Sequence, residues 1–142
     1  MARVDFYILN QPGQHSRQSF ACRLAEKAYR LDHTVHIHTG GPDDARRLDE
    51  LLWTFRDGSF VPHERLSSLG SSAQSPVTVG CAGDRVEPRD LLINLCDEIP
   101  DFAEAFPRVA ELVTSDDDCK QLSRRRFAEY RDQGHTLETH NV

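Results

Sequence analysis

The sequence lacks the features that mark membrane, secreted and disulfide-stapled proteins. None of its apolar runs approaches the roughly 20 residues that a membrane span needs. The N-terminal segment MARVDFYILN has no basic stretch followed by a long apolar run and a small-residue cleavage site, as a secretory signal would. The 4 cysteines are irregularly spaced and form no C-x-x-C pair. These absences predict a cytoplasmic protein whose cysteines are free thiols.

Motifs for nucleotide binding and catalysis are also missing. The chain contains no G-x-x-x-x-G-K-[ST] or G-x-G-x-x-G phosphate loop, no G-x-S-x-G nucleophile turn and no H-E-x-x-H metal helix. Gly40 and Gly41 do lie between a predicted strand and a predicted helix. However, Pro42 removes an N–H group at this turn, and the acidic pair that follows it would repel phosphate. The pattern is typical of a tight turn with an acidic helix start.

Two histidines offer a weak indication of a metal site. His36 and His38 are two residues apart on a predicted strand, so their side chains point to one face and could share an ion. Two ligands do not complete a site, and polar positions at the end of a sheet are the simpler interpretation. A nucleotide- or metal-dependent enzyme, using these histidines or Gly40 and Gly41, is the alternative function.

What the sequence does contain is an alternation of strand and helix patterns over 1–142, a length that suits one domain. β-Branched and aromatic residues predict strands at 4–9, 34–38, 76–79, 91–95 and 109–113. Helical spacing predicts helices at 16–31, 44–53 and about 117–133, with Ser16 and Ser115 as caps, and a short amphipathic segment at 101–106. Because parallel strands need helical crossovers, we expect a three-layer α/β/α fold, Rossmann-like but without a nucleotide site. The Ser- and Gly-rich segment 66–75 predicts a mobile loop.

Charge is distributed unevenly along the chain. The formal net charge of -6 argues against a protein whose main task is to grip nucleic acid directly. One acid, Glu129, nevertheless stands among five basic residues: Lys120, Arg124, Arg125, Arg126 and Arg131. On a helix Lys120, Arg124, Phe127 and Arg131 fall on one side. This mixture indicates a surface for an acidic peptide with a hydrophobic end, and an ordinary solvated helix face is the alternative.

Large apolar residues gather in a second region, at 51–55 and 59–63. Their number exceeds what one helix end and a short connection usually bury. Trp53 and Phe60, bordered by Pro62 and His63, form a composition that is typical of an interface anchor. The core could equally take these residues, so contact surface and core are both open.

The sequence resembles the chi subunit of bacterial DNA polymerase III holoenzyme, a clamp-loader accessory subunit, over nearly its whole length. The segments that carry the resemblance are, in order, VDFYIL (4–9), RLDELLW (47–53), SFVPH (59–63), DLLINL (90–95), DFAEAF (101–106) and KQLSRRRFAEYRDQGHTL (120–137). The resemblance implies a three-layer α/β fold and an adaptor of DNA replication that has no cofactor and no catalytic activity.

The resemblance also implies two docking surfaces. One binds the acidic C-terminal tail of the single-stranded DNA-binding protein, and its residues here are Val113, Lys120, Arg124, Phe127, Tyr130 and Thr139. The other binds the psi subunit, which connects chi to the clamp loader, through Trp53, Phe60 and Pro62, and is also linked to an accessory helicase. Ala128 stands where the family pattern has a lysine, and the C-terminus lacks the family's late tryptophan. Arg125 and Arg131 are the candidates to compensate.

Overall fold

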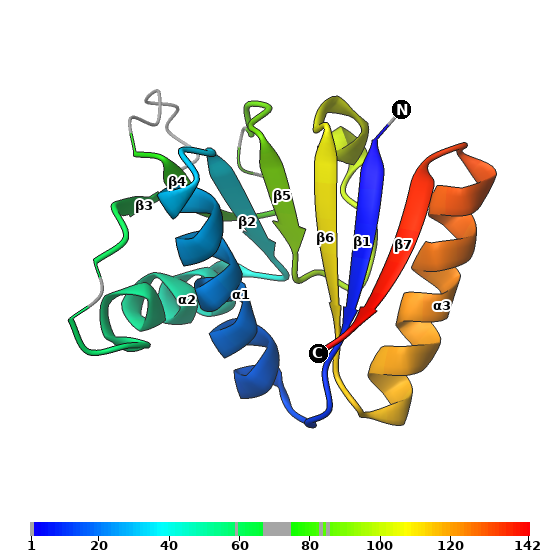
Figure 1. Cartoon of the computed structure of the whole chain (residues 1–142), viewed down its shortest axis with the longest axis horizontal. Coiled ribbons are helices and arrows are strands. Elements are labelled where there is room, and N and C mark those ends of the chain that lie inside the picture. Colours follow the sequence, from blue (N-terminus) through cyan, green and yellow to red (C-terminus); the bar gives the residue numbers. More distant parts are fainter. Residues whose placement is uncertain (1, 59, 67–74, 83, 85) are drawn as a thin grey trace.

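The computed structural model describes residues 2–58, 60–66, 75–82, 84 and 86–142 (Figure 1). Its strands are β1 (Arg3–Ile8), β2 (Val35–Thr39), β3 (His63–Arg65), β4 (Val77–Cys81), β5 (Leu91–Asn94), β6 (Arg108–Val113) and β7 (Thr136–Asn141). Its helices are α1 (Gln14–Arg30), α2 (Pro42–Thr54), α3 (Asp117–Asp132) and the 3-10 helix η1 (Asp101–Ala105). No helix formed by these residues is long and apolar enough to cross a membrane. The predicted helices are confirmed, whereas β3 and β7 were not predicted.

The seven strands form one sheet in the order β3-β4-β2-β5-β6-β1-β7, and every neighbouring pair is parallel. The two strands that the sequence patterns missed, β3 and β7, are the two edges of this sheet. β3 has three residues, and β7 has one apolar residue, Leu137, among five polar ones, so neither has the buried apolar run of a central strand. Figure 1 shows α3 running alongside β7, with α1 and α2 nearer the opposite edge.

Two apolar clusters on opposite faces of the sheet make the fold three-layered. One lies between the sheet and the helices α1 and α2, and includes Ile37, Leu48 and Ile93. The other lies between the sheet and the elements η1 and α3, and includes Leu92 and Phe106. Successive residues of β5 thus belong to different clusters, as the alternation of side chains along a strand requires. The expected three-layer α/β/α fold is confirmed.

Local details of the helix starts differ from the sequence prediction. α1 begins at Gln14, because Gly13 has a φ of 93° and turns the chain earlier than Ser16. Ser16 is therefore inside the helix, and its Oγ donates to the backbone oxygen of Pro12 at 2.8 Å. The N-cap position of α3 is Asp116, so the prediction of Ser115 was also wrong. Most of the predicted 66–75 loop, residues 67–74, lies outside the described residues.

Candidate functional site

Helix α3 is held in place by charges at its start and a glycine at its end. Asp117 and Asp118 lie in the first turn and Arg131 in the last, which is the favourable arrangement for the helix dipole. Gly134 has a φ of 87°, and its N–H donates to the Arg131 oxygen at 3.0 Å. The left-handed glycine ends the helix and sends the chain back along the sheet as β7.

The inward face of α3 carries polar side chains rather than a purely apolar stripe. Arg126 Nε donates to Glu111 Oε1 at 3.0 Å, and the Tyr130 hydroxyl donates to Glu111 Oε2 at 2.7 Å. Asn94 Nδ2 donates to the same Oε2 at 2.8 Å, and Arg126 Nη2 donates to Ser123 Oγ at 3.0 Å. Burial raises the pKa of the Glu111 carboxyl, and the charge of Arg126 opposes that rise. Arg126 is thus a structural residue and is not one of the exposed basic residues of α3.

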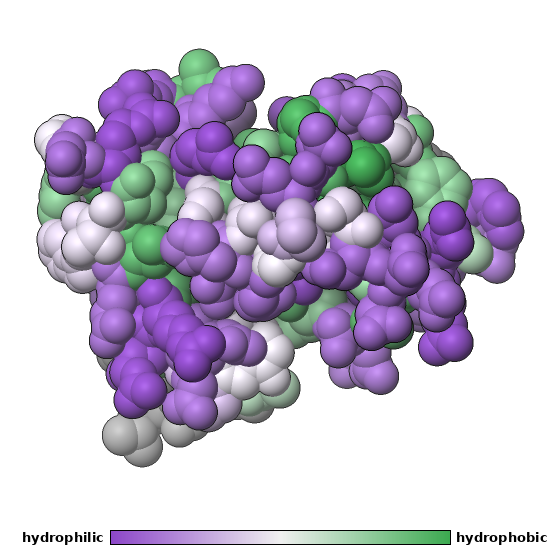
Figure 2. All heavy atoms as spheres, turned by 90° about the horizontal axis from the view of Figure 1, so that it is seen from below, coloured by the Kyte–Doolittle hydropathy of each residue, from purple (hydrophilic) through white to green (hydrophobic). Residues whose placement is uncertain are grey.

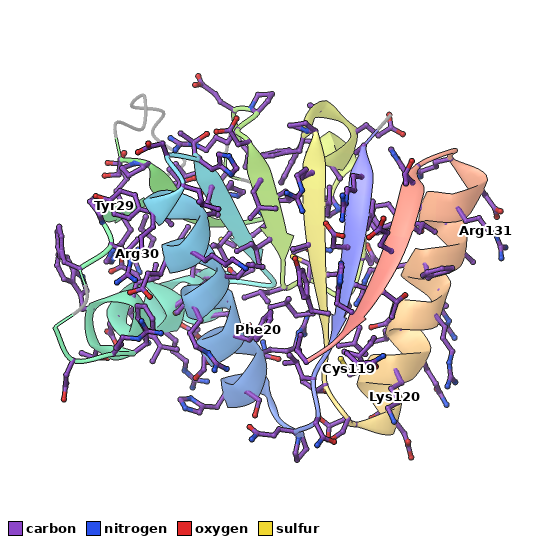
Figure 3. All side chains as sticks on the ribbon, in the orientation of Figure 1. Phe20, Tyr29, Arg30, Cys119, Lys120 and Arg131 are labelled. Carbon is purple, nitrogen blue, oxygen red and sulfur yellow. The ribbon has the colours of Figure 1, made fainter. Side chains whose placement is uncertain are left out.

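The outward side of α3 carries the stripe predicted from the sequence, which we call the α3 stripe: Lys120, Arg124, Phe127 and Arg131. Arg124 is exposed and Lys120 is half-buried, while Arg131 is paired with Asp132 at 3.4 Å. Phe127 is half-buried, and its ring centroid lies 5.3 Å from that of Phe6. Figure 3 shows Lys120 and Arg131 at opposite ends of α3. The stripe therefore combines two cations that have no ion-pair partner among the described residues, Lys120 and Arg124, with part of an aromatic face.

Strand β7 brings Thr139 to the face of the sheet that α3 covers. Thr139 is paired with Phe6, which lies in the cluster under α3, so the exposed threonine is on the same face. Val113 is on this face too but is only 3% exposed, and Tyr130 is 1% exposed. Of the six residues expected for the tail surface, four reach the surface and these two lie beneath it.

The second surface, which we call the aromatic patch, consists of Trp53, Phe60 and Pro62, and the buried side chain of His63 lies beneath it. Trp53 is 55% exposed and Phe60 is 61% exposed, and their ring centroids are 5.4 Å apart. The His63 ring lies 4.7 Å from the Trp53 ring, with Nδ1 2.6 Å from the Val61 oxygen and Nε2 3.0 Å from the Asp49 oxygen. The neighbouring Leu52 and Val61 are buried. The apolar residues of this region thus divide between core and surface.

The histidines and glycines considered for an alternative enzyme function lie in β2 and at the start of α2, away from both surfaces. His36 and His38 lie in β2 and are both buried, and His36 Nδ1 lies 2.8 Å from Thr78 Oγ1. Their facing nitrogens are 3.3 Å apart, and burial lowers the pKa of His36 to about 3. Their rings also lie near those of Phe102 and Phe106. Gly41 precedes α2, with Pro42 at its first position and Asp43 in its first turn, as the tight-turn interpretation requires.

One group of potential metal ligands occurs among the described residues. It lies on β1 and β7, on the face of the sheet opposite the one that α3 covers. Single ligand atoms of Asp5, Glu138 and His140 lie within 4.8 Å of one another. Asp5 already accepts from Arg3 at 3.2 Å and from Arg108 at 3.1 Å. Although burial opposes ionisation, hydrogen bonds from His140 and Arg108 lower the pKa of Asp5. With two guanidinium groups on the carboxylate, the group is an ion-pair cluster rather than a cation site.

Fold and surfaces together define an α/β domain with a mixed basic and aromatic surface on α3 and an exposed aromatic patch formed by the end of α2 and the connection that follows it. The family model for the DNA polymerase III chi subunit, HolC, matches residues 1–138. The chain belongs to this family, which confirms the resemblance seen in the sequence, and the family is that of a replication accessory subunit.

Three relatives share this family name. The chain is 41% identical to the DNA polymerase III subunit chi of Pseudomonas aeruginosa over 142 residues, which cover 100% of this chain and 98% of the relative. It is 37% identical to that of Haemophilus influenzae, with 98% and 96% covered, and 35% identical to that of Escherichia coli, with 98% and 97% covered. Among solved structures it is similar to T4 UvsW, with a TM-score of 0.70 at 9% identity, over 99% of this chain and 41% of that one. This last likeness concerns the fold alone.

Sequence reasoning missed the polar network beneath α3. Glu111 lies within the predicted strand 109–113, where a single charged residue between apolar neighbours is a visible signal. A buried carboxylate needs a cationic partner, and that signal could have directed attention to one of the three consecutive arginines at 124–126. Which of the three faces inward depends on the rotation of α3, which the sequence pattern alone did not specify.

Proposed function

We propose that this protein is a non-catalytic adaptor of the bacterial replication machinery, acting in the cytoplasm. It binds the acidic C-terminal tail of the single-stranded DNA-binding protein and, through the psi subunit, links that tail to the clamp loader of DNA polymerase III. Family membership supports a role in the polymerase assembly. The observation that carries the tail proposal is the α3 stripe, where Arg124 and Lys120 stand beside the partly exposed ring of Phe127.

The tail would bind along the junction of α3 and β7. Arginine holds a carboxylate with two parallel hydrogen bonds, so Arg124 is suited to an acidic side chain or the terminal carboxylate. Lys120, one turn earlier, adds a second cation on the same side of the helix. Phe127 and Thr139 would receive the apolar end of the tail, and Val113 and Tyr130 support that surface from beneath. The acidic remainder of the chain disfavours direct binding of nucleic acid.

A charge reversal tests the tail surface. The double variant Lys120→Glu with Arg124→Glu should lower affinity for an acidic peptide ending in phenylalanine by more than tenfold, measured by fluorescence anisotropy. The matched control is Arg46→Glu with Arg47→Glu, which makes the same charge change at exposed positions of α2. Binding of wild type should also weaken with added salt, because exposed charges are screened over about 10 Å at 0.1 M. If the test and control variants lost the same affinity, the tail would not bind at the α3 stripe.

The psi subunit would dock on the aromatic patch. Exposed tryptophan is the residue type most enriched among interface hot spots, and Trp53 is already held against Phe60 and His63 in the free protein. Such preorganisation reduces the entropy lost on binding.

Co-purification of tagged chain with the psi subunit tests this second surface. Trp53→Ala should abolish or strongly reduce recovery of psi. Leu31→Ala is the control, because Leu31 is 60% exposed and equally apolar but lies at the end of α1. If Trp53→Ala left recovery of psi unchanged, or if Leu31→Ala reduced it equally, the aromatic patch would not be the psi site. Unchanged binding of the tail peptide to Trp53→Ala separates the two surfaces.

A further inference from the structure

A cavity of about 330 Å³ lies where the carboxyl ends of β1 and β6 diverge. These strands are neighbours, but the chain leaves β1 for α1 on one face of the sheet and leaves β6 for α3 on the other. Such switch points are where parallel α/β sheets bind small ligands. The cavity is lined from both sides, by Gly13, Gln14 and Arg17 and by Thr114, Asp116 and Arg126. Figure 1 shows both loops at the same end of the sheet, and Figure 2, seen from that end, shows a largely hydrophilic surface.

Arg17 is the unusual residue of this cavity. It is only 6% exposed, and among the described residues its Nε and Nη2 are buried without any hydrogen-bond partner. Its Nη1 makes one long contact, 3.4 Å from Gln14 Oε1. Nε and Nη2 are the two nitrogens whose N–H groups point the same way, so they match two oxygens of one oxyanion. A buried guanidinium is costly unless it is paired, which points to a missing anionic partner.

The first turn of α1 adds donors to the same place. The first N–H groups of a helix have no intrahelical acceptor, and no side chain caps them in α1. α2 and α3 each begin with two aspartates in the first turn, whereas α1 has no acidic residue there. The positive end of the α1 dipole is therefore not complemented by a carboxylate of its own first turn.

The carboxylates that border the cavity limit the charge it can accept. Asp116 is already engaged, because its Oδ2 accepts from the Gly13 N–H at 2.8 Å and from the Thr114 hydroxyl at 2.9 Å. Asp97 and Asp118 also line the cavity, and both are exposed to solvent. Arg126 has its carboxylate partner in Glu111. Burial raises the pKa of the Glu111 carboxyl and the charge of Arg17 helps to oppose that rise, but among the described residues Arg17 Nε and Nη2 have no hydrogen-bond partner. A single guanidinium with two unpaired donors favours one phosphate group over a chain of several.

We propose that this cavity is a binding site for the phosphate group of a small molecule, with Arg17 Nε and Nη2 holding two of its oxygens and the first turn of α1 donating to a third. The site is separate from the α3 stripe and from the aromatic patch, and the proposal does not depend on either docking partner. Nothing in it requires catalysis.

Calorimetric titration of the full chain tests the site, using inorganic phosphate and, separately, a nucleoside monophosphate in chloride buffer of matched ionic strength. Wild type should bind phosphate. Arg17→Met, which keeps an unbranched apolar stem but removes the guanidinium donors, should bind at least tenfold more weakly. Arg47→Met makes the same charge change at an exposed position of α2 and should bind as wild type does. Tighter binding of the nucleoside monophosphate would show that its nucleoside fills the rest of the cavity.

Thermal unfolding provides a second readout. Phosphate should raise the melting temperature of wild type and of Arg47→Met but not that of Arg17→Met, because a ligand stabilises only the state that binds it. If Arg17→Met did not fold, Arg17→Lys would replace it, and we expect weaker binding because lysine cannot form the bidentate contact. Absence of binding by wild type, or wild-type affinity in the Arg17 variants, would overturn the proposal.

Discussion

Arg124 and Arg126 lie two residues apart on α3, yet one is exposed and the other is buried against the carboxylate of Glu111. The helix turns by about 100° per residue, so a separation of two residues carries a side chain from the solvent to the sheet. An exposed arginine contributes little to folding and is available to a partner, whereas a buried paired one holds the helix in position. We therefore expect substitutions on the inward face to change stability and substitutions on the outward face to change binding.

The largest effect should follow from breaking the buried pair. Arg126→Met leaves the Glu111 carboxylate without its cation in a dry environment, and we expect a loss of about 3–5 kcal/mol in the free energy of unfolding, measured with urea. Arg124→Met, the outward counterpart, should change stability by less than about 0.5 kcal/mol. The double variant Arg126→Met with Glu111→Leu should recover much of the loss, since no charge is then stranded. Equal stabilities of the two single variants would contradict the division between inward and outward faces.

A smaller loss should follow from removing one donor of the same network. Tyr130→Phe takes away the hydroxyl that donates to Glu111 at 2.7 Å but keeps the ring that packs against Phe6. Hydrogen bonds to charged groups contribute about 1.5–3 kcal/mol, so we expect a destabilisation in that range. Tyr29→Phe is the control, because Tyr29 is a half-buried tyrosine on α1, away from this network. Tail-peptide affinity should stay near that of wild type, which would show that Tyr130 supports the surface rather than contacting the tail.

His36 is a buried titratable group that is neutral, in contrast to the buried ion pair of Arg126 and Glu111. Burial lowers its pKa from the ordinary 6.5 to about 3, so between these pH values the unfolded chain binds more protons than the folded one. Stability should therefore fall as the pH drops below 6.5, by at most about 1.4 kcal/mol per pH unit from this residue. His36→Gln should flatten the dependence over pH 4–6.5 in urea unfolding curves.

Burial also lowers the pKa of His38, so some acid sensitivity should persist in the His36 variant. His33→Gln, at an exposed position, is the control and should leave the slope as it is in wild type. An unchanged slope in His36→Gln would mean that other groups dominate the acid sensitivity.

The distinction between buried and exposed residues also explains which parts of the fold and of the site could be predicted from the sequence. Strand and helix periodicity was enough to predict the parallel three-layer fold, because β2, β5 and β6 are buried on both faces and have clear apolar runs. It could not identify β7, whose residues are mostly exposed and whose position depends on pairing with β1. Nor could it distinguish Arg126 from its two basic neighbours, since only the packed position of α3 decides which guanidinium meets Glu111.

The smallest effect we predict concerns Ala128, on the outward side of α3 between Arg124 and Arg131. The resemblance seen in the sequence implies a lysine at this position, and on a helix residue 128 is one turn from both arginines. Ala128→Lys should leave stability nearly unchanged and strengthen tail-peptide binding by a factor of about 2–5, since exposed ion pairs contribute about 0.2–1 kcal/mol. Ala105→Lys adds the same charge at an exposed position of η1 and serves as the control. The gain should disappear at high salt. A gain of equal size in both variants would indicate a general effect of net charge, whereas a gain confined to Ala128→Lys would favour an incomplete cationic set on α3 over full compensation by Arg125 or Arg131.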